Sequence, residues 1–80
     1  MSPQKAAETL DLSGVPCPQN AARALLRIEG MAPGSVLAVI LDDGEPIRNV
    51  PPVLEAEGHK ELFRARENKG WRLVMRRGDR

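Results

Sequence analysis

The fold of this chain is decided by one stretch, Leu10-Asp11-Leu12-Ser13-Gly14-Val15-Pro16-Cys17-Pro18. Residues 9–13 alternate apolar and polar side chains, which is typical of a half-buried strand with Leu10 and Leu12 on its inner side. Pro18 suits the first position of a helix, because proline loses no helix hydrogen bond there and its φ angle is preset. The stretch therefore predicts a strand, a short loop and a helix, with Cys17 as the N-cap residue.

Cys17 is the only cysteine of the chain. Free amides and the positive end of a helix dipole favour an anion, and the reactive form of cysteine is the thiolate. Pro16 and Pro18 place the residue in a strand-to-helix loop, and such loops run over the surface. We expect an exposed, reactive thiol rather than a buried apolar side chain. Gln19 and Asn20 either donate hydrogen bonds to a sulfur anion or are polar only because helix starts commonly are.

The rest of the chain reads as alternating helices and strands. The pattern predicts a helix over Pro18–Glu29, a buried strand over Ser35–Leu41, a helix over about Pro46–Glu57, and a hairpin of strands Glu61–Glu67 and Gly70–Arg76. Prolines 51 and 52 predict that the second helix is kinked or that its regular part starts at position 51. The order βαβαββ predicts an α+β fold, a two-layer α/β sandwich with a mixed four-stranded sheet and two helices on one face.

The size of the chain predicts one small domain. Its 80 residues, 41% of them apolar, suffice for a single core over residues 8–77, with loose tails at 1–7 and 78–80. A single cysteine excludes an internal disulfide and suits a reducing compartment, so the cytoplasm is expected. Apolar runs of signal-peptide or membrane-span length are missing from the sequence, so we expect neither export nor a membrane partner.

The charges of the chain are distributed unevenly. Residues 1–59 carry four bases against eight acids, a net charge of −4, whereas residues 60–80 carry eight bases against three acids, a net charge of +5. A basic hairpin suits an acidic partner surface or a nucleic-acid backbone. The docking candidates are Arg64, Arg66, Arg72 and Arg76. RNA-binding proteins usually stack bases on exposed aromatic rings, but Phe63 and Trp71 both suit the core.

Other kinds of site are not indicated. The acids at 42, 43 and 45 lack the ligand series of a calcium loop, and the sequence holds no Cys/His set for zinc, so no metal is expected. The glycines form no phosphate-binding fingerprint, so no nucleotide cofactor is expected. His59 follows the second predicted helix, at the end of the sheet opposite Cys17. A catalytic Cys/His pair is therefore not expected.

The stretch from Leu10 to Pro18, together with the order of elements, resembles the TusA/SirA/YedF sulfur-carrier family over roughly residues 8–77. The family signature is Gly-x-x-Cys-Pro-x-Pro after the first strand, and Gly14, Cys17 and Pro18 match it. Ala32-Pro33-Gly34, Asp42-Asp43 and Gly58-His59 add further similarity. The sequence has Asn20 where the family has its second proline.

The resemblance implies a sulfur carrier. Cys17 would accept a persulfide from a cysteine desulfurase or rhodanese-like donor and pass the outer sulfur to an acceptor protein, in tRNA thiolation, cofactor synthesis or sulfur metabolism. The supporting residues would be Gly14, Pro16, Pro18, Gln19 and Asn20. No cofactor beyond the covalent persulfide sulfur is expected, and the resemblance favours a monomer. The alternatives are an RNA-binding or regulatory module that uses the basic hairpin, and a thiol-based redox sensor.

Overall fold

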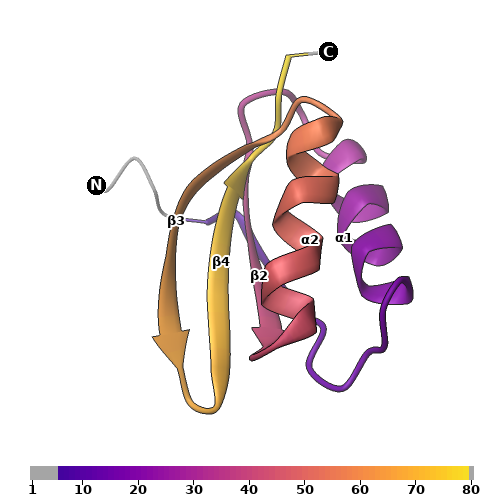
Figure 1. The fold of residues 1–80 in the computed structure, drawn as a ribbon. Coiled ribbons are helices and arrows are strands. Elements are labelled where there is room, and N and C mark those ends of the chain that lie inside the picture. The colour runs from indigo at the N-terminus through magenta and orange to yellow at the C-terminus, as the bar shows by residue number, and fades with distance from the viewer. Residues whose placement is uncertain (1–5, 80) are drawn as a thin grey trace.

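A computed structural model describes residues 6–79 (Figure 1). The elements, in chain order, are β1 (Glu8–Asp11), α1 (Gln19–Glu29), β2 (Val36–Asp42), α2 (Glu45–Ala56), β3 (Lys60–Glu67) and β4 (Gly70–Arg76). The predicted fold class is confirmed: the fold is α+β, and both helices cover the same face of a mixed four-stranded sheet (Figure 1). Most of the tail predicted over residues 1–7 lies outside the described residues, and Ala7 donates its N–H to the carbonyl of Val36 at 2.9 Å.

The strand order of the sheet is β1-β2-β4-β3. β1 runs parallel to β2, whereas β4 is antiparallel to both β2 and β3. β2 and β4 occupy the centre, which explains why β2 is a continuous run of apolar, mostly branched side chains. Because β1 and β2 are parallel, their carboxyl ends meet at one edge of the sheet. Loop 12–18, which carries Cys17, leaves β1 at that edge, the position where open α/β sheets usually place their functional groups (Figure 1).

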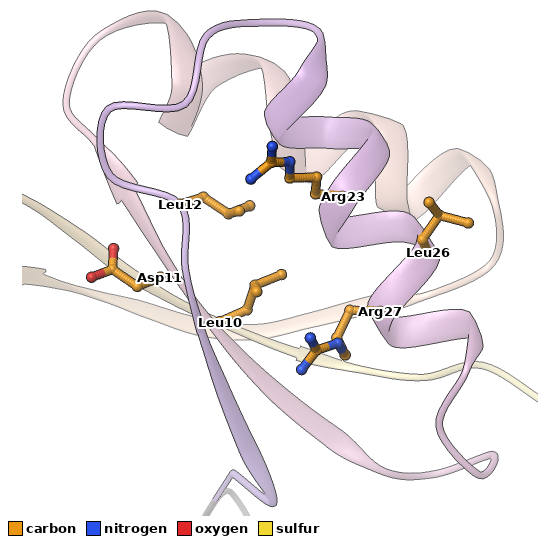
Figure 2. A pocket seen from close by; sticks show the side chains of 6 residues that line it. All are labelled: Leu10, Asp11, Leu12, Arg23, Leu26 and Arg27. Atoms are coloured by element: carbon orange, nitrogen blue, oxygen red, sulfur yellow. The ribbon is translucent and has the colours of Figure 1, made fainter.

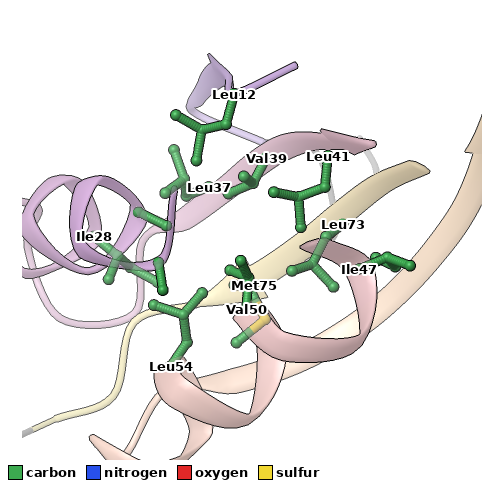
Figure 3. Close-up of a cluster of buried hydrophobic side chains, with 12 residues drawn as sticks. Leu12, Ile28, Leu37, Val39, Leu41, Ile47, Val50, Leu54, Leu73 and Met75 are labelled. Carbon is green, nitrogen blue, oxygen red and sulfur yellow. The ribbon is translucent and has the colours of Figure 1, made fainter. Parts of the chain in front are cut away.

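The main core lies between the sheet and the two helices (Figure 3). Its fully buried side chains include Ile28 from α1, Leu54 from α2 and Leu73 from β4. A second, smaller cluster of Val36, Ala38 and Val74 lies on the other face of the sheet, where Leu62 packs against it. The helix-free face is therefore partly shielded by the side chains of the sheet itself.

Two local expectations need correction. α1 begins at Gln19 with Pro18 as its N-cap, so Cys17 is not the N-cap residue. α2 runs without a break from Glu45 to Ala56 and includes both internal prolines, so its regular part does not start at Pro51. Its inner face packs along most of its length, and this burial offsets the two missing backbone donors. The buried side chains of α2 are Ile47, Val50, Pro51 and Leu54.

Candidate functional site

Cys17 is an exposed, free cysteine in loop 12–18. The loop connects the buried Leu12 to the first turn of α1, and the Cys17–Pro18 peptide bond is cis. Pro16 and Pro18 are both exposed. Since the thiol stands outside the core and is not in a disulfide, it is accessible to a reaction partner.

Three backbone N–H groups at the start of α1, those of Asn20, Ala21 and Ala22, have acceptors other than the sulfur, against the expectation that the sulfur faces free amides. The N–H of Asn20 donates to the carbonyl of Pro16 at 3.0 Å, and that of Ala22 to the carbonyl of Pro18 at 3.1 Å. The N–H between them, on Ala21, donates to Asn20 Oδ1 at 2.7 Å. The proline carbonyls on both sides of Cys17 thus take the donors that were expected to hold the sulfur.

A side chain provides the polar contact to the sulfur. Asn20 Nδ2 donates to Cys17 Sγ at 3.2 Å. Asn20 is completely buried, although it lies only three residues from the exposed thiol. Its amide is therefore fixed by the surrounding side chains and contacts Cys17 Sγ from the buried side. Gln19, one residue earlier, is exposed, and its side chain makes no hydrogen bond among the described residues.

The loop is tied to the sheet through Gly14. Gly14 has a φ of +78°, a conformation that L side chains rarely adopt, and its N–H donates to Asp42 Oδ2 at 2.7 Å. Asp42 is the last residue of β2, so the carboxyl end of the neighbouring strand anchors the loop. The contact between Asp42 and Gly14 was not expected from the sequence. The parallel pairing of β1 and β2 could have indicated it, because that pairing brings the end of β2 to the start of the loop.

A second carboxylate shapes the start of the loop. Asp11 accepts hydrogen bonds from the hydroxyl and from the backbone N–H of Ser13. The hydroxyl, and after it the N–H, hold the pKa of Asp11 below its ordinary value, because both bonds favour the ionised carboxylate. Both acids near the loop thus act as hydrogen-bond acceptors for its backbone.

Removing the Asp42 side chain is expected to loosen the loop. In an Asp42→Ala variant the Gly14 N–H loses its charged acceptor, and a hydrogen bond to a charged group contributes about 1.5–3 kcal/mol. We expect hydrogen exchange at Gly14 to become about 10-fold faster or more, whereas exchange in the centre of β4 changes much less. Asp42→Asn keeps an acceptor oxygen and is the matched control. Equal exchange at Gly14 in the wild type and in Asp42→Ala would refute the anchoring role.

His59 lies far from the cysteine, as expected from the topology. It is buried at the start of β3, its Nδ1 accepts the N–H of Gly78 at 3.1 Å, and its Nε2 faces Glu29 Oε2 at 3.4 Å. The end of α1, the start of β3 and the end of β4 meet at the edge of the sheet opposite loop 12–18 (Figure 1). His59 therefore connects the end of α1 with the segment that follows β4, and it is not placed to act on Cys17.

The four docking candidates lie on two faces of the sheet. Arg64 pairs with Leu73 and Arg66 with Trp71 in the register of β3 and β4, which places both arginines on the helix-covered face. Arg72 and Arg76 lie opposite Ile40 and Val36 of β2, on the helix-free face.

Three of these arginines also have acidic partners. Arg64 contacts Glu61 at 2.7 Å, Arg66 contacts Asp43 at 3.3 Å, and Arg72 contacts Glu67 at 3.7 Å. Arg76 has no ion pair among the described residues. The hairpin is therefore not one continuous basic patch.

Of the two aromatic residues expected in the core, Trp71 packs against the main core cluster and Phe63 does not. Phe63 is 43% exposed, because it lies at a β-bulge on the edge strand β3 and no helix covers its face of the sheet. Trp71 is half-buried; its indole N–H donates to Asp43 Oδ1 at 2.8 Å, and the Arg66 guanidinium stacks on its ring at 4.9 Å. The Trp71 hydrogen bond, with smaller contributions from a backbone N–H and Arg66, holds the pKa of Asp43 below its ordinary value.

Two hollows flank the loop. One, of about 360 Å³, lies between β1 and α1, where Arg23 and Arg27 extend from the helix toward the strand (Figure 2). Its other lining residues are Leu10, Asp11, Leu12 and Leu26. The second, of about 290 Å³, separates Ser13 and the end of β2 from the turn between β3 and β4. Neither hollow includes Cys17 in its lining, so the exposed thiol lies outside both.

Residues 6–79 contain no group of three or more His, Cys, Asp or Glu side chains that could hold a metal ion. Neither described helix is long and apolar enough to cross a membrane.

Comparison with known proteins gives one consistent family. The sequence model described as Sulfurtransferase TusA matches residues 8–77. A protein of Archaeoglobus fulgidus named "Putative sulfur carrier protein" is 34% identical over 74 residues, which cover 91% of this chain and 84% of the relative.

Two solved structures share the fold. The crystal structure of a SirA-like protein from Desulfitobacterium hafniense has a TM-score of 0.76 at 22% identity and covers 89% of this chain and 97% of its own. The solution structure of a Helicobacter pylori protein has a TM-score of 0.72 at 23% identity and covers 88% of this chain and 96% of its own.

Proposed function

Because this chain belongs to the TusA sulfurtransferase family, we propose that it is a sulfur carrier that holds a persulfide on Cys17 and passes the outer sulfur to a partner protein. The observation that carries the proposal is the exposed, free thiol at the carboxyl end of β1, with the buried amide of Asn20 donating to its sulfur. Gly14, Pro16, Pro18 and Gln19 form the loop and helix start around it.

Loading requires no oxidant. The Cys17 thiolate attacks the outer sulfur of a donor persulfide, a new S–S bond forms to Sγ, the S–S bond of the donor breaks, and the donor leaves as a thiolate. Delivery repeats the exchange, with the acceptor thiolate attacking the outer sulfur and Cys17 leaving as thiolate. The donor would be a cysteine desulfurase or a rhodanese-like protein. A free thiol persists most readily in a reducing compartment such as the cytoplasm.

The surroundings of Cys17 suit a carrier better than a self-contained enzyme. The sequence has no second cysteine to resolve a persulfide as a disulfide, and His59 is buried at the opposite edge of the sheet. The thiol lies outside both described hollows and is reached from the protein surface. A surface-exposed carrier atom is what transfer between two proteins requires.

The arginines are docking candidates on two separate surfaces. Arg72 and Arg76 flank the helix-free face, and Arg64 and Arg66 flank the other face. An acidic donor and an acidic acceptor would then approach different sides of the hairpin. The RNA-binding alternative needs a continuous row of cations beside stacking aromatic rings. Phe63 is exposed, but the four arginines are split between the two faces of the hairpin and form no continuous row, so the arrangement favours protein partners.

Intact-protein mass spectrometry under non-reducing conditions tests the proposal. The natural chain and a Cys17→Ser variant are each incubated with a cysteine desulfurase and free cysteine, and in parallel with polysulfide. We expect the natural chain to gain whole sulfur atoms that a reductant removes, and the serine variant to gain none. If neither source loads Cys17, the carrier function is wrong. A peroxide-induced gain of oxygen without any gain of sulfur would instead support a redox sensor.

A further inference from the structure

The orientation of the Asn20 amide follows from its neighbours. The N–H of Ala21 donates at 2.7 Å to one end of the amide, which must therefore be the oxygen. The other end, which faces Cys17 Sγ at 3.2 Å, is then the NH₂ group. Because the side chain is completely buried, the surrounding core restricts it to this arrangement.

An NH₂ group only donates, so its contact with sulfur depends on the charge of the sulfur. A thiol is a weak acceptor, whereas a thiolate is a full negative charge, and charge-assisted hydrogen bonds are about twice as strong as neutral ones. The backbone amides of Asn20, Ala21 and Ala22 already have other acceptors. Among the described residues, the Asn20 side chain is the donor that lies within hydrogen-bond distance of Cys17 Sγ, so it can favour the anionic sulfur.

We propose that Asn20 is a positioning residue whose hydrogen bond to the Cys17 sulfur is stronger when that sulfur is a thiolate, and that it fixes the direction of the sulfur at the surface. The purpose of this contact rests on the proposed function. The hydrogen bond itself does not, since it acts on the thiolate whether or not a persulfide is ever loaded. A proline at position 20, as in the family signature, has no side-chain donor. This chain thus stabilises its reactive sulfur with an amide that the Gly-x-x-Cys-Pro-x-Pro pattern does not contain.

An Asn20→Asp variant tests the proposal. Aspartate has the same shape and still accepts the Ala21 N–H, but it presents an acceptor to the sulfur in place of a donor. Losing a charge-assisted bond should lower the fraction of Cys17 present as thiolate at neutral pH by about 10-fold or more. The remaining thiolate is more nucleophilic, with a Brønsted coefficient of about 0.4–0.5, so the net alkylation rate with iodoacetamide should fall about 3- to 10-fold.

The pH profile of alkylation separates this role from a merely structural one. At neutral pH, where the thiol is only partly ionised, Asn20→Asp should be alkylated more slowly than the wild type. At high pH, where the Cys17 thiol of both proteins is fully ionised and the rate no longer rises with pH, it should be alkylated faster. The two profiles should therefore cross. A general loosening of the loop gives no such crossing, because it changes the rate in one direction at every pH.

Two further variants complete the test. Ala22→Asp adds the same charge at an exposed position in the first turn of α1 and should leave the profile nearly unchanged. Asn20→Ala removes the donor without adding charge, and its profile should shift in the same direction by a smaller amount, which decides the question if the aspartate variant does not fold. Profiles of both Asn20 variants that match the wild type, or an equal shift in Ala22→Asp, would overturn the proposal.

This assay uses no sulfur donor, so its outcome is independent of the carrier function. Crossing profiles in a protein that no donor loads would support the role of Asn20 and contradict the carrier function. Normal persulfide loading with unchanged alkylation profiles would support the carrier function and contradict the role of Asn20.

Discussion

Leu73→Ala is expected to lower the free energy of unfolding by about 3–4 kcal/mol. Leu73 lies in the middle of β4 between Val39 of β2 and Arg64 of β3, and it is completely buried on the side of the sheet that α2 covers (Figure 3). The truncation removes a large apolar side chain and leaves a cavity that the neighbouring strands cannot close. A domain of this size has a total stability of about 4–12 kcal/mol, so the variant should be close to unfolding.

Urea denaturation followed by circular dichroism measures this effect. Leu26→Ala makes the same chemical change at a side chain on α1 that is 76% exposed, and it should alter the stability by no more than about 0.5 kcal/mol. Losses of similar size in the two variants would contradict the assignment of Leu73 to the core.

Gly70→Ala is expected to cost about 3 kcal/mol, at the upper end of what overpacking usually costs. A Cβ at this position would lie 2.3 Å from the carbonyl oxygen of Leu41 and 3.3 Å from its carbonyl carbon. Both atoms belong to the backbone of a central strand, which cannot move aside as a flexible side chain does. The displacement would reach Asp42, which holds Gly14 and with it the loop of Cys17. Hydrogen exchange at Gly14 should therefore rise along with the loss of stability.

Gly30→Ala is the matched control for this substitution. A Cβ on Gly30 would meet its nearest atoms, two backbone carbonyl oxygens of α1, at 3.5 and 3.6 Å, and its φ of −82° suits any residue. Alanine also reduces the conformational entropy of the unfolded chain, so this variant should be neutral or more stable by up to about 1 kcal/mol. Equal melting temperatures for Gly70→Ala and the wild type would contradict the close packing of β4 against Leu41.

Much of the architecture could be predicted from periodicity and turn residues. The branched apolar run now assigned to β2 predicted a central strand, and the spacing of Ala21, Leu25 and Ile28 predicted an amphipathic helix. These signals are local, because the period of the apolar residues reports which face of an element is buried. The continuity of α2 through Pro51 was not predictable, since proline disfavours a helix locally and only packing against the sheet offsets that cost.

The candidate site divides in the same way. The candidate for its reactive atom was evident in the sequence, since Cys17 is the only cysteine and stands between two prolines. Its hydrogen-bond partner was not evident. A helix start predicts backbone donors for the sulfur, yet the carbonyls of Pro16 and Pro18 take those of Asn20 and Ala22, and a buried side chain replaces them. The faces of the arginines also depend on the register of the hairpin, which includes a bulge between Glu61 and Phe63.

The sequence by itself determined the order of the elements and the faces that they bury, because both follow from the spacing of residues along the chain, and it singled out Cys17 as the candidate for the chemistry. Only the tertiary structure decided that Asn20 faces the sulfur, that Asp42 anchors the loop across 28 residues, and that the arginines are split between two faces. These contacts are set by how helix, strand and loop pack against one another, and spacing along the chain does not contain that information.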